Sequence, residues 1–264
     1  LLVRLFRDPS RKAPMRALLL AATLLAGPAA ALDHAAMTDE ERAAFRAEVR
    51  AYLLENPEVL MEAIAVLEER QAQAEAGRDM ALVAANRDAI LDDGRSWVGG
   101  NPEGDVTLVE FMDYRCGYCR QAAPEVEALV SGDGNVRFIL KEFPILGPQS
   151  DLAARFAIAV RLLHGPDAYK DVHDALMMMR ADVTPDALSR LAQGLALDPA
   201  PILARMDAPE ITEEIDANRA LAQALGITGT PTFVLGDRMV RGYVPLDAME
   251  AMVAQERDGA SGGG

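Results

Sequence analysis

The chain has 264 residues, a formal net charge of −15 and hydrophobic residues at 50% of its positions. That hydrophobic share excludes a disordered chain, and the acidic surplus argues against a nucleic-acid partner, because phosphate-binding proteins concentrate Lys and Arg. Two cysteines are too few for a disulfide-rich scaffold or a four-cysteine zinc site.

The first 31 residues have the pattern of a secretory signal peptide. Basic residues between positions 4 and 16 precede an apolar run, and small residues at 29–31 supply a cleavage site. The apolar stretch is shorter than the roughly 20 residues that cross a bilayer. We therefore predict export to the periplasm with cleavage after Ala31. Met15-Arg16 would itself begin a compact signal, an alternative that leaves residues 1–14 outside the natural product.

Residues 32–95 are predicted to form an N-terminal helical arm. Thr38 and Glu41 have the spacing of a capping box, and Asn56-Pro57 interrupts the first helix. The second helix carries apolar residues at helical spacing, at Leu60, Ile64 and Leu67. Beyond position 68 the pattern thins, so this helix has little to bury alone. Two interpretations remain open: a solvated spacer, or an oligomerisation arm whose apolar stripes pack against other copies.

A boundary rich in Asp and Gly, at 92–94 and 99–102, separates the arm from a mixed domain. Residues 106–112 and 136–140 are strand signals, with a helix between them. Strand, helix and strand in this order form a βαβ unit and imply a parallel sheet.

The rest of the chain is predicted to be helical, apart from one hairpin. Residues 150–226 are almost wholly helical by pattern, and Ser150, Thr184 and Asp198 are placed to cap helices. The hairpin pairs 232–235 with 239–241 across a Gly-Asp turn. A closing helix is expected to span 246–257, followed by a disordered tail at 258–264.

Cys116 and Cys119 lie where the first strand meets its helix. Free N–H groups and the helix dipole at this position stabilise an anion, which lowers the pKa of the Cys116 thiol. The i, i+3 spacing brings Cys119 beneath Cys116 on the same helix face. We expect Cys116 to be exposed and to attack a disulfide, and Cys119 to resolve the mixed disulfide.

Three other interpretations of the cysteine pair are weaker. A metal site would need further ligands, and the three histidines at 34, 164 and 173 are distant in sequence, so no metal is expected. A structural disulfide across so short a loop would restrain the unfolded chain very little. Two inert buried thiols match a strand-to-helix junction poorly.

Three motifs resemble the DsbA-like thiol-disulfide oxidoreductases. They are the segments 111–119 (FMDYRCGYC), 141–147 (KEFPILG) and 229–233 (GTPTF). The resemblance covers roughly residues 96–257, and the arm segment 52–62 resembles the ScsC/Com1-like branch. It implies an α/β fold: a thioredoxin domain from 96–149 and 227–257, with a helical domain inserted at 150–226. The redox-active group would be the Cys116–Cys119 disulfide itself, without a further cofactor.

The resemblance also implies roles for residues outside the cysteine pair. The Thr230-Pro231 bond is expected to be cis, and the backbone of Thr230 to pair with an extended substrate peptide beside Gly117 and Tyr118. Glu110 matches the family's buried acid, which relays the proton of Cys119. If strand alternation instead points Glu110 to solvent, it has no role.

Several other residues keep two interpretations. Pro124 resembles the kink proline of the thioredoxin helix, or has only a local effect. Lys141 and Glu142 form a charged pair near the site, or a surface pair. The run 177–179 (MMM) is helical core, a soft binding surface or a set of copper ligands.

The dipeptide between the cysteines, Gly117-Tyr118, lacks the histidine of DsbA itself, which implies a less oxidising disulfide. With Thr230 before the proline it resembles DsbC-type isomerases. We therefore expect a periplasmic disulfide isomerase or reductase acting on cysteine-containing proteins. It would be a homo-oligomer, as in trimeric ScsC relatives, kept reduced by a DsbD/ScsB-like membrane partner.

Two alternatives of different kinds remain. The first is a monomeric dithiol oxidase recharged by a DsbB-like membrane oxidant. The second is a non-enzymatic chaperone or copper-handling protein, in which the dithiol is incidental.

Overall fold

The computed structural model describes residues 37–261, so the predicted signal peptide lies outside the described residues. The chain separates into two compact units, Leu1–Val66 and Leu67–Gly264. Between residues 37 and 261, no helix combines the length and the apolar character that a membrane crossing requires.

The first unit contains helix α1 (Asp39–Glu55) and the beginning of α2 (Glu58–Ala85). The predicted capping box is confirmed: the Glu41 amide donates to the Thr38 hydroxyl, and the Glu41 carboxylate accepts from the Thr38 amide at 2.8 Å. The predicted break is also confirmed, because α1 ends one residue before Asn56.

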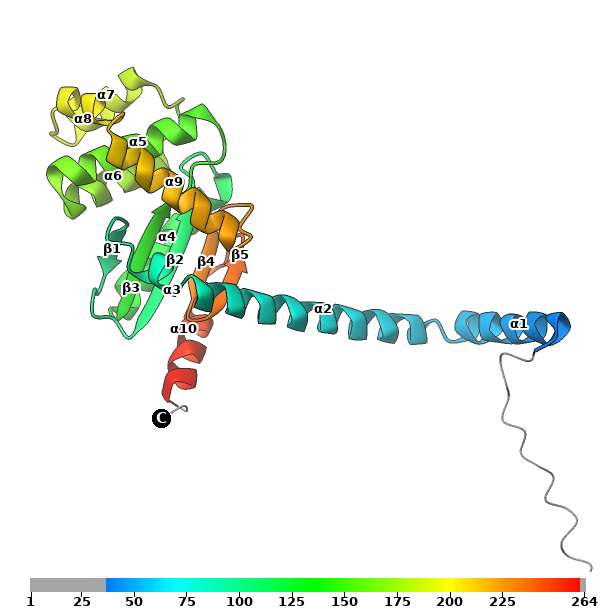
Figure 1. Cartoon of the computed structure of the whole chain (residues 1–264). Helices are drawn as coiled ribbons and strands as arrows, with labels where there is room; N and C mark the ends of the chain where they lie inside the picture. Colours follow the sequence, from blue (N-terminus) through cyan, green and yellow to red (C-terminus); the bar gives the residue numbers. More distant parts are fainter. Residues whose placement is uncertain (1–36, 262–264) are drawn as a thin grey trace, which may run out of the picture. The chain divides into compact units, whose positions relative to one another are not determined.

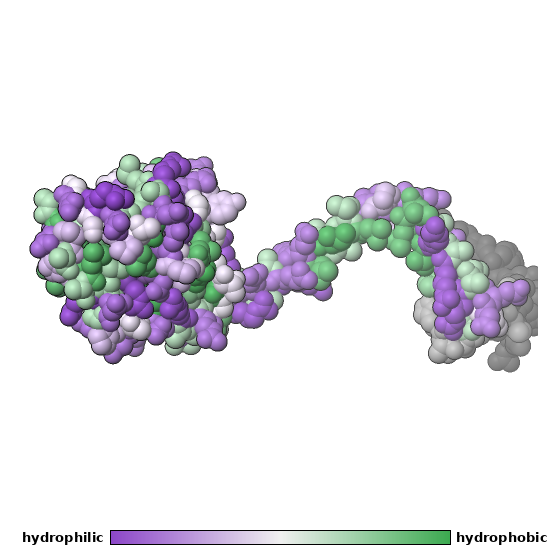
Figure 2. All heavy atoms as spheres, turned by 90° about the horizontal axis from the view of Figure 1, so that it is seen from above, coloured by the Kyte–Doolittle hydropathy of each residue, from purple (hydrophilic) through white to green (hydrophobic). Residues whose placement is uncertain are grey.

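Helix α1 and the first half of α2 expose most of their large apolar side chains, and none of the residues of α1 is buried. Figure 2 shows hydrophobic residues gathered along it. The exposed apolar residues include Val49, Tyr52, Leu54, Leu60, Met61, Ile64 and Val66. These apolar residues are therefore uncovered within a single chain.

The second unit is built on a five-stranded sheet with the order β1-β3-β2-β4-β5 (Figure 1). The strands are β1 (Trp97–Gly100), β2 (Val106–Met112), β3 (Val136–Glu142), β4 (Thr232–Leu235) and β5 (Arg238–Arg241). Strands β2 and β3 run parallel and are joined by α4 (Gly117–Asp133), while the other neighbouring pairs are antiparallel. The predicted βαβ unit and hairpin are confirmed.

Strand β1 was not expected from the sequence, which assigns its two glycines to a boundary. That assignment is wrong, because Trp97 to Gly100 pair with β3 in antiparallel register. Glycine weakens a strand, so the sequence signal is poor. The strand is held through its first side chain: the Trp97 indole stacks on Tyr169, meets Phe138 edge-on and donates to the carbonyl of Pro166 at 3.0 Å.

Five helices separate β3 from β4, each with a proline in its first turn. They are α5 (Pro148–His164), α6 (Pro166–Met178), α7 (Pro185–Gly194), α8 (Pro199–Arg205) and α9 (Pro209–Ala224). Thr184 and Asp198 cap α7 and α8 as predicted. Ser150 does not cap α5, because the helix begins two residues earlier and the hydroxyl of Ser150 is bonded elsewhere.

Each face of the sheet carries its own hydrophobic core. One core takes Leu108 and Met112 of β2, together with α4, α5, α6 and the closing helix α10 (Leu246–Ser261). The other takes Val109 and Phe111 of β2, with α9, the end of α2 and the short helix α3 (Arg87–Leu91). Because Val83 and Ile90 belong to this second core, the end of the segment assigned to the arm packs on the sheet.

The closing helix extends further than the sequence predicts. The tail was predicted to be disordered from residue 258, but α10 continues to Ser261. The guanidinium of Arg257 holds this end by ion pairs with Asp105 at 2.8 Å and Asp133 at 2.6 Å.

Two glycines give a matched test of this packing. A Cβ added at Gly104 would lie 2.5 Å from the backbone oxygen of Asn135, whereas one at Gly77 in α2 meets nothing within 4 Å. We expect Gly104→Ala to lower the midpoint of thermal unfolding. We expect Gly77→Ala to raise stability by about 0.5–1 kcal/mol, because alanine restricts the unfolded chain. Calorimetry measures the unfolding temperature of both variants. An equal change in the two would contradict the close contact between Gly104 and the backbone of Asn135.

Candidate active site

The two cysteines lie at the N-terminus of α4, just beyond the end of β2. Cys116 is the N-cap residue of the helix, and its amide donates to the carbonyl of Asp113 at 3.0 Å. Both thiols are free. Cys119 is fully buried, one turn into α4, and Cys116 is only 8% exposed. The expectation of an exposed Cys116 is therefore wrong, and the reason is the loop that faces it.

That loop contains Thr230 and Pro231, whose peptide bond is cis, as predicted. The Cys116 thiol donates to the carbonyl of Thr230 across 3.1 Å. Pro231 has no N–H, and its own carbonyl is occupied by the amide of Gly242 at 2.8 Å. Gly117 and Tyr118, by contrast, are exposed at the start of α4, with Tyr118 at 63%.

The site favours the ionised form of Cys116. A hydrogen bond from Cys119, a further one from the side chain of Thr230 and the backbone N–H groups of Cys119 and Tyr118 lower the pKa of Cys116 to about 5, against the opposing effect of burial. These donors converge on one sulfur because it caps the helix, where N–H groups have no partner inside the helix. Cys116 is therefore largely a thiolate at neutral pH.

Cys119 has the opposite tendency. Burial, the hydrogen bond it donates to Cys116 and the charge of Glu110 raise the pKa of Cys119 far above its usual value. The pair is thus a thiolate beside a protonated thiol, and Cys119 needs a base before it can react.

Glu110 of β2 is buried, with 3% of its surface exposed. Its side chain lies on the face of the sheet against which α4 and Cys119 pack. Burial, followed by the negative charge of Cys116, raises the pKa of Glu110 to about 8. Within the described residues, its Oε1 atom has no hydrogen-bond partner. The alternative in which Glu110 points to solvent does not hold in this structure.

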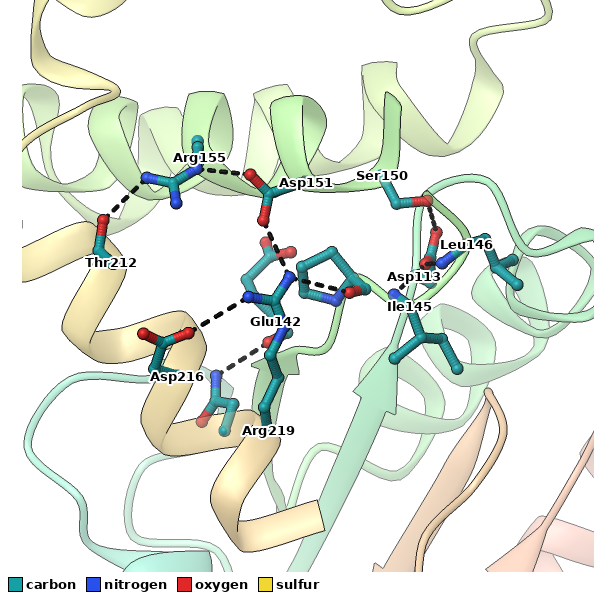
Figure 3. A network of polar contacts seen from close by, with 12 residues as sticks. Asp113, Glu142, Ile145, Leu146, Ser150, Asp151, Arg155, Thr212, Asp216 and Arg219 are labelled. Atoms are coloured by element: carbon teal, nitrogen blue, oxygen red, sulfur yellow. Dashed lines mark hydrogen bonds and ion pairs between the residues drawn. The ribbon is translucent and has the colours of Figure 1, made fainter. Parts of the chain in front are cut away.

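Asp113 was not singled out from the sequence, although it shapes the site. Its buried carboxylate accepts four hydrogen bonds: from the amides of Arg115, Ile145 and Leu146 and from the hydroxyl of Ser150, at 2.7–3.0 Å. Figure 3 shows three of these donors converging on it. The carboxylate joins the turn that precedes Cys116 to the segment between β3 and α5.

The same segment is held from the other side by α9 (Figure 3). The guanidinium of Arg219 donates to the carbonyl of Pro144 at 3.2 Å and pairs with Asp151 at 3.0 Å. The amide of Asn218 donates to the backbone oxygen of Glu142 at 3.1 Å. The inserted helix α9 and the cysteine turn therefore both form hydrogen bonds with the same segment, residues 142–146.

Glu142 and Lys141 are both buried, and they do not pair with each other, so both earlier interpretations of them are wrong. Their side chains lie on opposite faces of β3, because successive residues of a strand alternate. Lys141 Nζ binds Asp93 at 2.6 Å and the carbonyl of Ala89 at 2.9 Å. It thereby fastens the segment between α3 and β1 to the sheet.

Glu142 forms the centre of a buried cluster beneath the cysteine turn. The hydroxyls of Tyr114 and Tyr169 each donate to its Oε1 atom at 2.7 Å, and the Tyr114 hydroxyl lies 3.2 Å from Nδ1 of His173. Burial raises the pKa of Glu142 to about 8 and lowers that of His173 to about 3. His173 of α6 thus contacts the cysteine turn through Tyr114.

The remaining candidates are dispersed. Met177 is buried, whereas Met178 is 80% exposed, so the methionine run divides between core and surface. Pro124 lies inside α4 and is exposed. In the described part of the chain, no group of three or more His, Cys, Asp or Glu side chains is arranged to hold a metal ion.

Comparisons with known proteins agree with this geometry. Residues 107–254 match the model of the DSBA-like thioredoxin domain, and residues 41–74 match that of the N-terminal domain of the copper resistance protein ScsC. A thioredoxin-like oxidoreductase from Silicibacter pomeroyi shares 44% identity with a TM-score of 0.62, over 66% of this chain and 98% of that one. BcfH from Salmonella enterica Typhimurium shares 31% identity with a TM-score of 0.68, over 83% and 96%.

One curated relative is a much longer protein, of which only a part matches this chain. The Na⁺/H⁺ antiporter NhaA 3 of Salinispora tropica is 31% identical over 191 residues, which is 68% of this chain and 28% of that protein. The chain therefore spans about a quarter of the length of the first curated relatives that it matches. The matches confirm the predicted thioredoxin fold and the resemblance on which that prediction rested.

The ionisation of Cys116 can be measured directly. The rate of alkylation by iodoacetamide should rise with pH through a midpoint near 5 and stay level above pH 7, because the thiolate is the reactive form. Cys116→Ser should not react at pH 7, since Cys119 is buried and protonated. A midpoint near the ordinary value of 9.0 would contradict the stabilisation described.

Proposed function

Because the chain belongs to the DSBA-like thioredoxin-domain family, we propose that it is a periplasmic thiol-disulfide oxidoreductase that acts on cysteine-containing proteins. More specifically, we propose a disulfide isomerase or reductase that works as a homo-oligomer. The observation that carries the proposal is the asymmetry of the pair: Cys116 has a pKa of about 5, and Cys119 is buried with a raised pKa.

The first chemical step is common to both activities. The Cys116 thiolate attacks one sulfur of a substrate disulfide, so the substrate S–S bond breaks and a Cys116–substrate disulfide forms. The other substrate sulfur leaves as a thiolate and takes a proton from water. The cis-proline loop supports this step, because the substrate backbone can pair with Thr230 beside the reacting sulfur.

The second step decides the outcome. In isomerisation, another substrate thiolate attacks the mixed disulfide, forms a new substrate disulfide and releases Cys116 as a thiolate, with no net transfer of electrons. In reduction, Cys119 loses its proton to Glu110 and attacks Sγ of Cys116. The Cys116–Cys119 disulfide forms, the second substrate thiolate leaves, and two electrons pass to the substrate. A membrane reductant would then restore the dithiol.

The arm supports the isomerase form of the proposal. Its exposed apolar residues, such as Leu54 and Met61, each at 66%, would be covered by helices of other copies. An oligomer would hold a misfolded substrate between several Cys116 thiolates. A trimer is the form suggested by the resemblance to ScsC.

A dithiol oxidase is the second candidate, and one observation favours it. A disulfide becomes more oxidising as the thiolate of its reduced form is stabilised, and the pKa of Cys116 is low although no histidine lies between the cysteines. In that direction the two steps of reduction run backwards, and a membrane oxidant recharges the pair.

The isomerase form can be tested by refolding a protein with scrambled disulfides. Full-length protein should restore the native pairing, Cys116→Ser should not, and light scattering should give a multiple of the single-chain mass. A single-chain mass together with rapid oxidation of a reduced peptide and no reshuffling would instead establish the oxidase.

Glu110 and Glu142 provide a matched pair for the proton step. Both are buried carboxyls with a pKa raised to about 8, but Glu142 is bonded to two tyrosines, whereas the charge of Glu110 acts on Cys119. We expect Glu110→Gln to slow the release of a mixed disulfide by about 10²-fold at pH 8. In the wild type this rate should rise as pH passes 8, because the base is the ionised carboxylate.

The control variant Glu142→Gln should retain that pH profile. Stopped-flow measurement of mixed-disulfide release provides the rates. Equal slowing by both substitutions would show that Glu110 acts through stability alone and would reject the relay.

A further inference from the structure

A groove opens beside the dithiol, between α4 and α6, with a volume of about 480 Å³. Its apolar lining comes from both helices: Ala123, Pro124, Met177 and Met178. Met178 is 80% exposed, which is a large exposure for an unbranched apolar side chain. Methionine adapts to different apolar partners, so this lining suits side chains of varied shape.

The end of the groove near the cysteines is basic. It is lined by Arg120, which directly follows Cys119, and by Arg180, which follows α6. Arg120 lies close enough to Arg115, Arg180 and Cys116 for their charges to act on its guanidinium. Three arginines therefore gather next to the nucleophile in a chain whose net charge is −15.

The cluster is only partly neutralised by the protein itself. Arg115 is 3.8 Å from the exposed carboxylate of Asp182. Arg120 donates through Nε to the carbonyl of Tyr114 at 2.8 Å, but its buried Nη2 atom has no partner among the described residues. Within residues 37–261, neither Arg120 nor Arg180 forms an ion pair.

The acidic residues that line the groove form ion pairs with Lys170 and not with the arginines. Lys170 Nζ binds Asp174 at 2.6 Å and Glu127 at 3.0 Å, and both carboxylates line the groove. Lys170 offsets one of the two carboxylates, so these three groups together keep one negative charge. The groove is therefore negative at the end that holds Glu127 and Asp174 and positive at the end of Arg120 and Arg180, which borders Cys116.

We propose that this groove is a docking surface for the substrate polypeptide and selects segments in which acidic and apolar residues flank the reacting cysteine. The proposal rests on the proposed function, because the mixed disulfide brings a substrate chain beside Cys116. Acidic side chains would pair with Arg180 and Arg120, and apolar ones would cover Met178. Arg180 and Met178 are then specificity-determining residues, and the chemistry remains with the cysteines.

The test compares two short peptides. Each carries one cysteine joined by a disulfide to the chromogenic thiol thionitrobenzoate, with Leu and either Glu or Gln on both sides. Attack of the Cys116 thiolate on the peptide sulfur joins Cys116 to the peptide and releases coloured thionitrobenzoate. The second-order rate constant for this release is the measurement, at low and high salt.

We expect the wild type to react about 10-fold faster with the Glu peptide at low salt, although the whole chain is acidic. The preference should shrink at 1 M salt, where charges are screened within about 3 Å. Arg180→Gln should reduce the preference for the Glu peptide about 3-fold. Met178→Ser should slow both peptides.

The control variant is Arg190→Gln, which removes an exposed arginine of α7 outside the groove and should change neither rate. Equal rates of the wild type with the two peptides, or an equal effect of Arg190→Gln and Arg180→Gln on the preference, would overturn the docking surface. Absence of exchange with either peptide would instead count against the proposed function. The two failures are therefore distinguishable.

Discussion

The buried carboxylate of Asp113 is the constraint on which the geometry of the cysteine pair depends. A carboxylate inside a protein is stable only when hydrogen bonds replace its water, and Asp113 accepts four of them. Its donors come from the cysteine turn, from the loop after β3 and from α5. Moving any one of these segments would take one or two donors away from a buried carboxylate, so the cysteine turn and the inserted helices keep one arrangement.

Burial then gives neighbouring groups different chemistry. Cys116 stands at a helix terminus, where N–H groups face it, and is therefore ionised at neutral pH. Cys119 and Glu110 lie deeper, where their desolvation outweighs any stabilisation of the charged form, and both remain protonated near pH 7. A shift of three residues along one helix thus separates an ionised thiol from a protonated one, and in the proposed mechanism Glu110 takes the proton of the second.

The sequence predicts those parts of the site that local pattern determines. Cys116 and Cys119 are found where their position between strand and helix places them, and the bond before Pro231 is cis, as the resemblance to the family implies. The strand β1 was missed, because a strand ending in two glycines has little signal of its own. Asp113 was missed too, because its partners at 145, 146 and 150 are joined to it only by the fold.

The division of labour between the two thiols is the central claim, and trapping the mixed disulfide tests it most directly. Reduced Cys119→Ser protein should accumulate a covalent adduct with a disulfide-containing substrate, and mass spectrometry of its peptides should locate the link at Cys116. Cys116→Ser protein should form no such adduct, since Cys119 is buried and protonated. An adduct through Cys119 forming at a comparable rate would contradict the account.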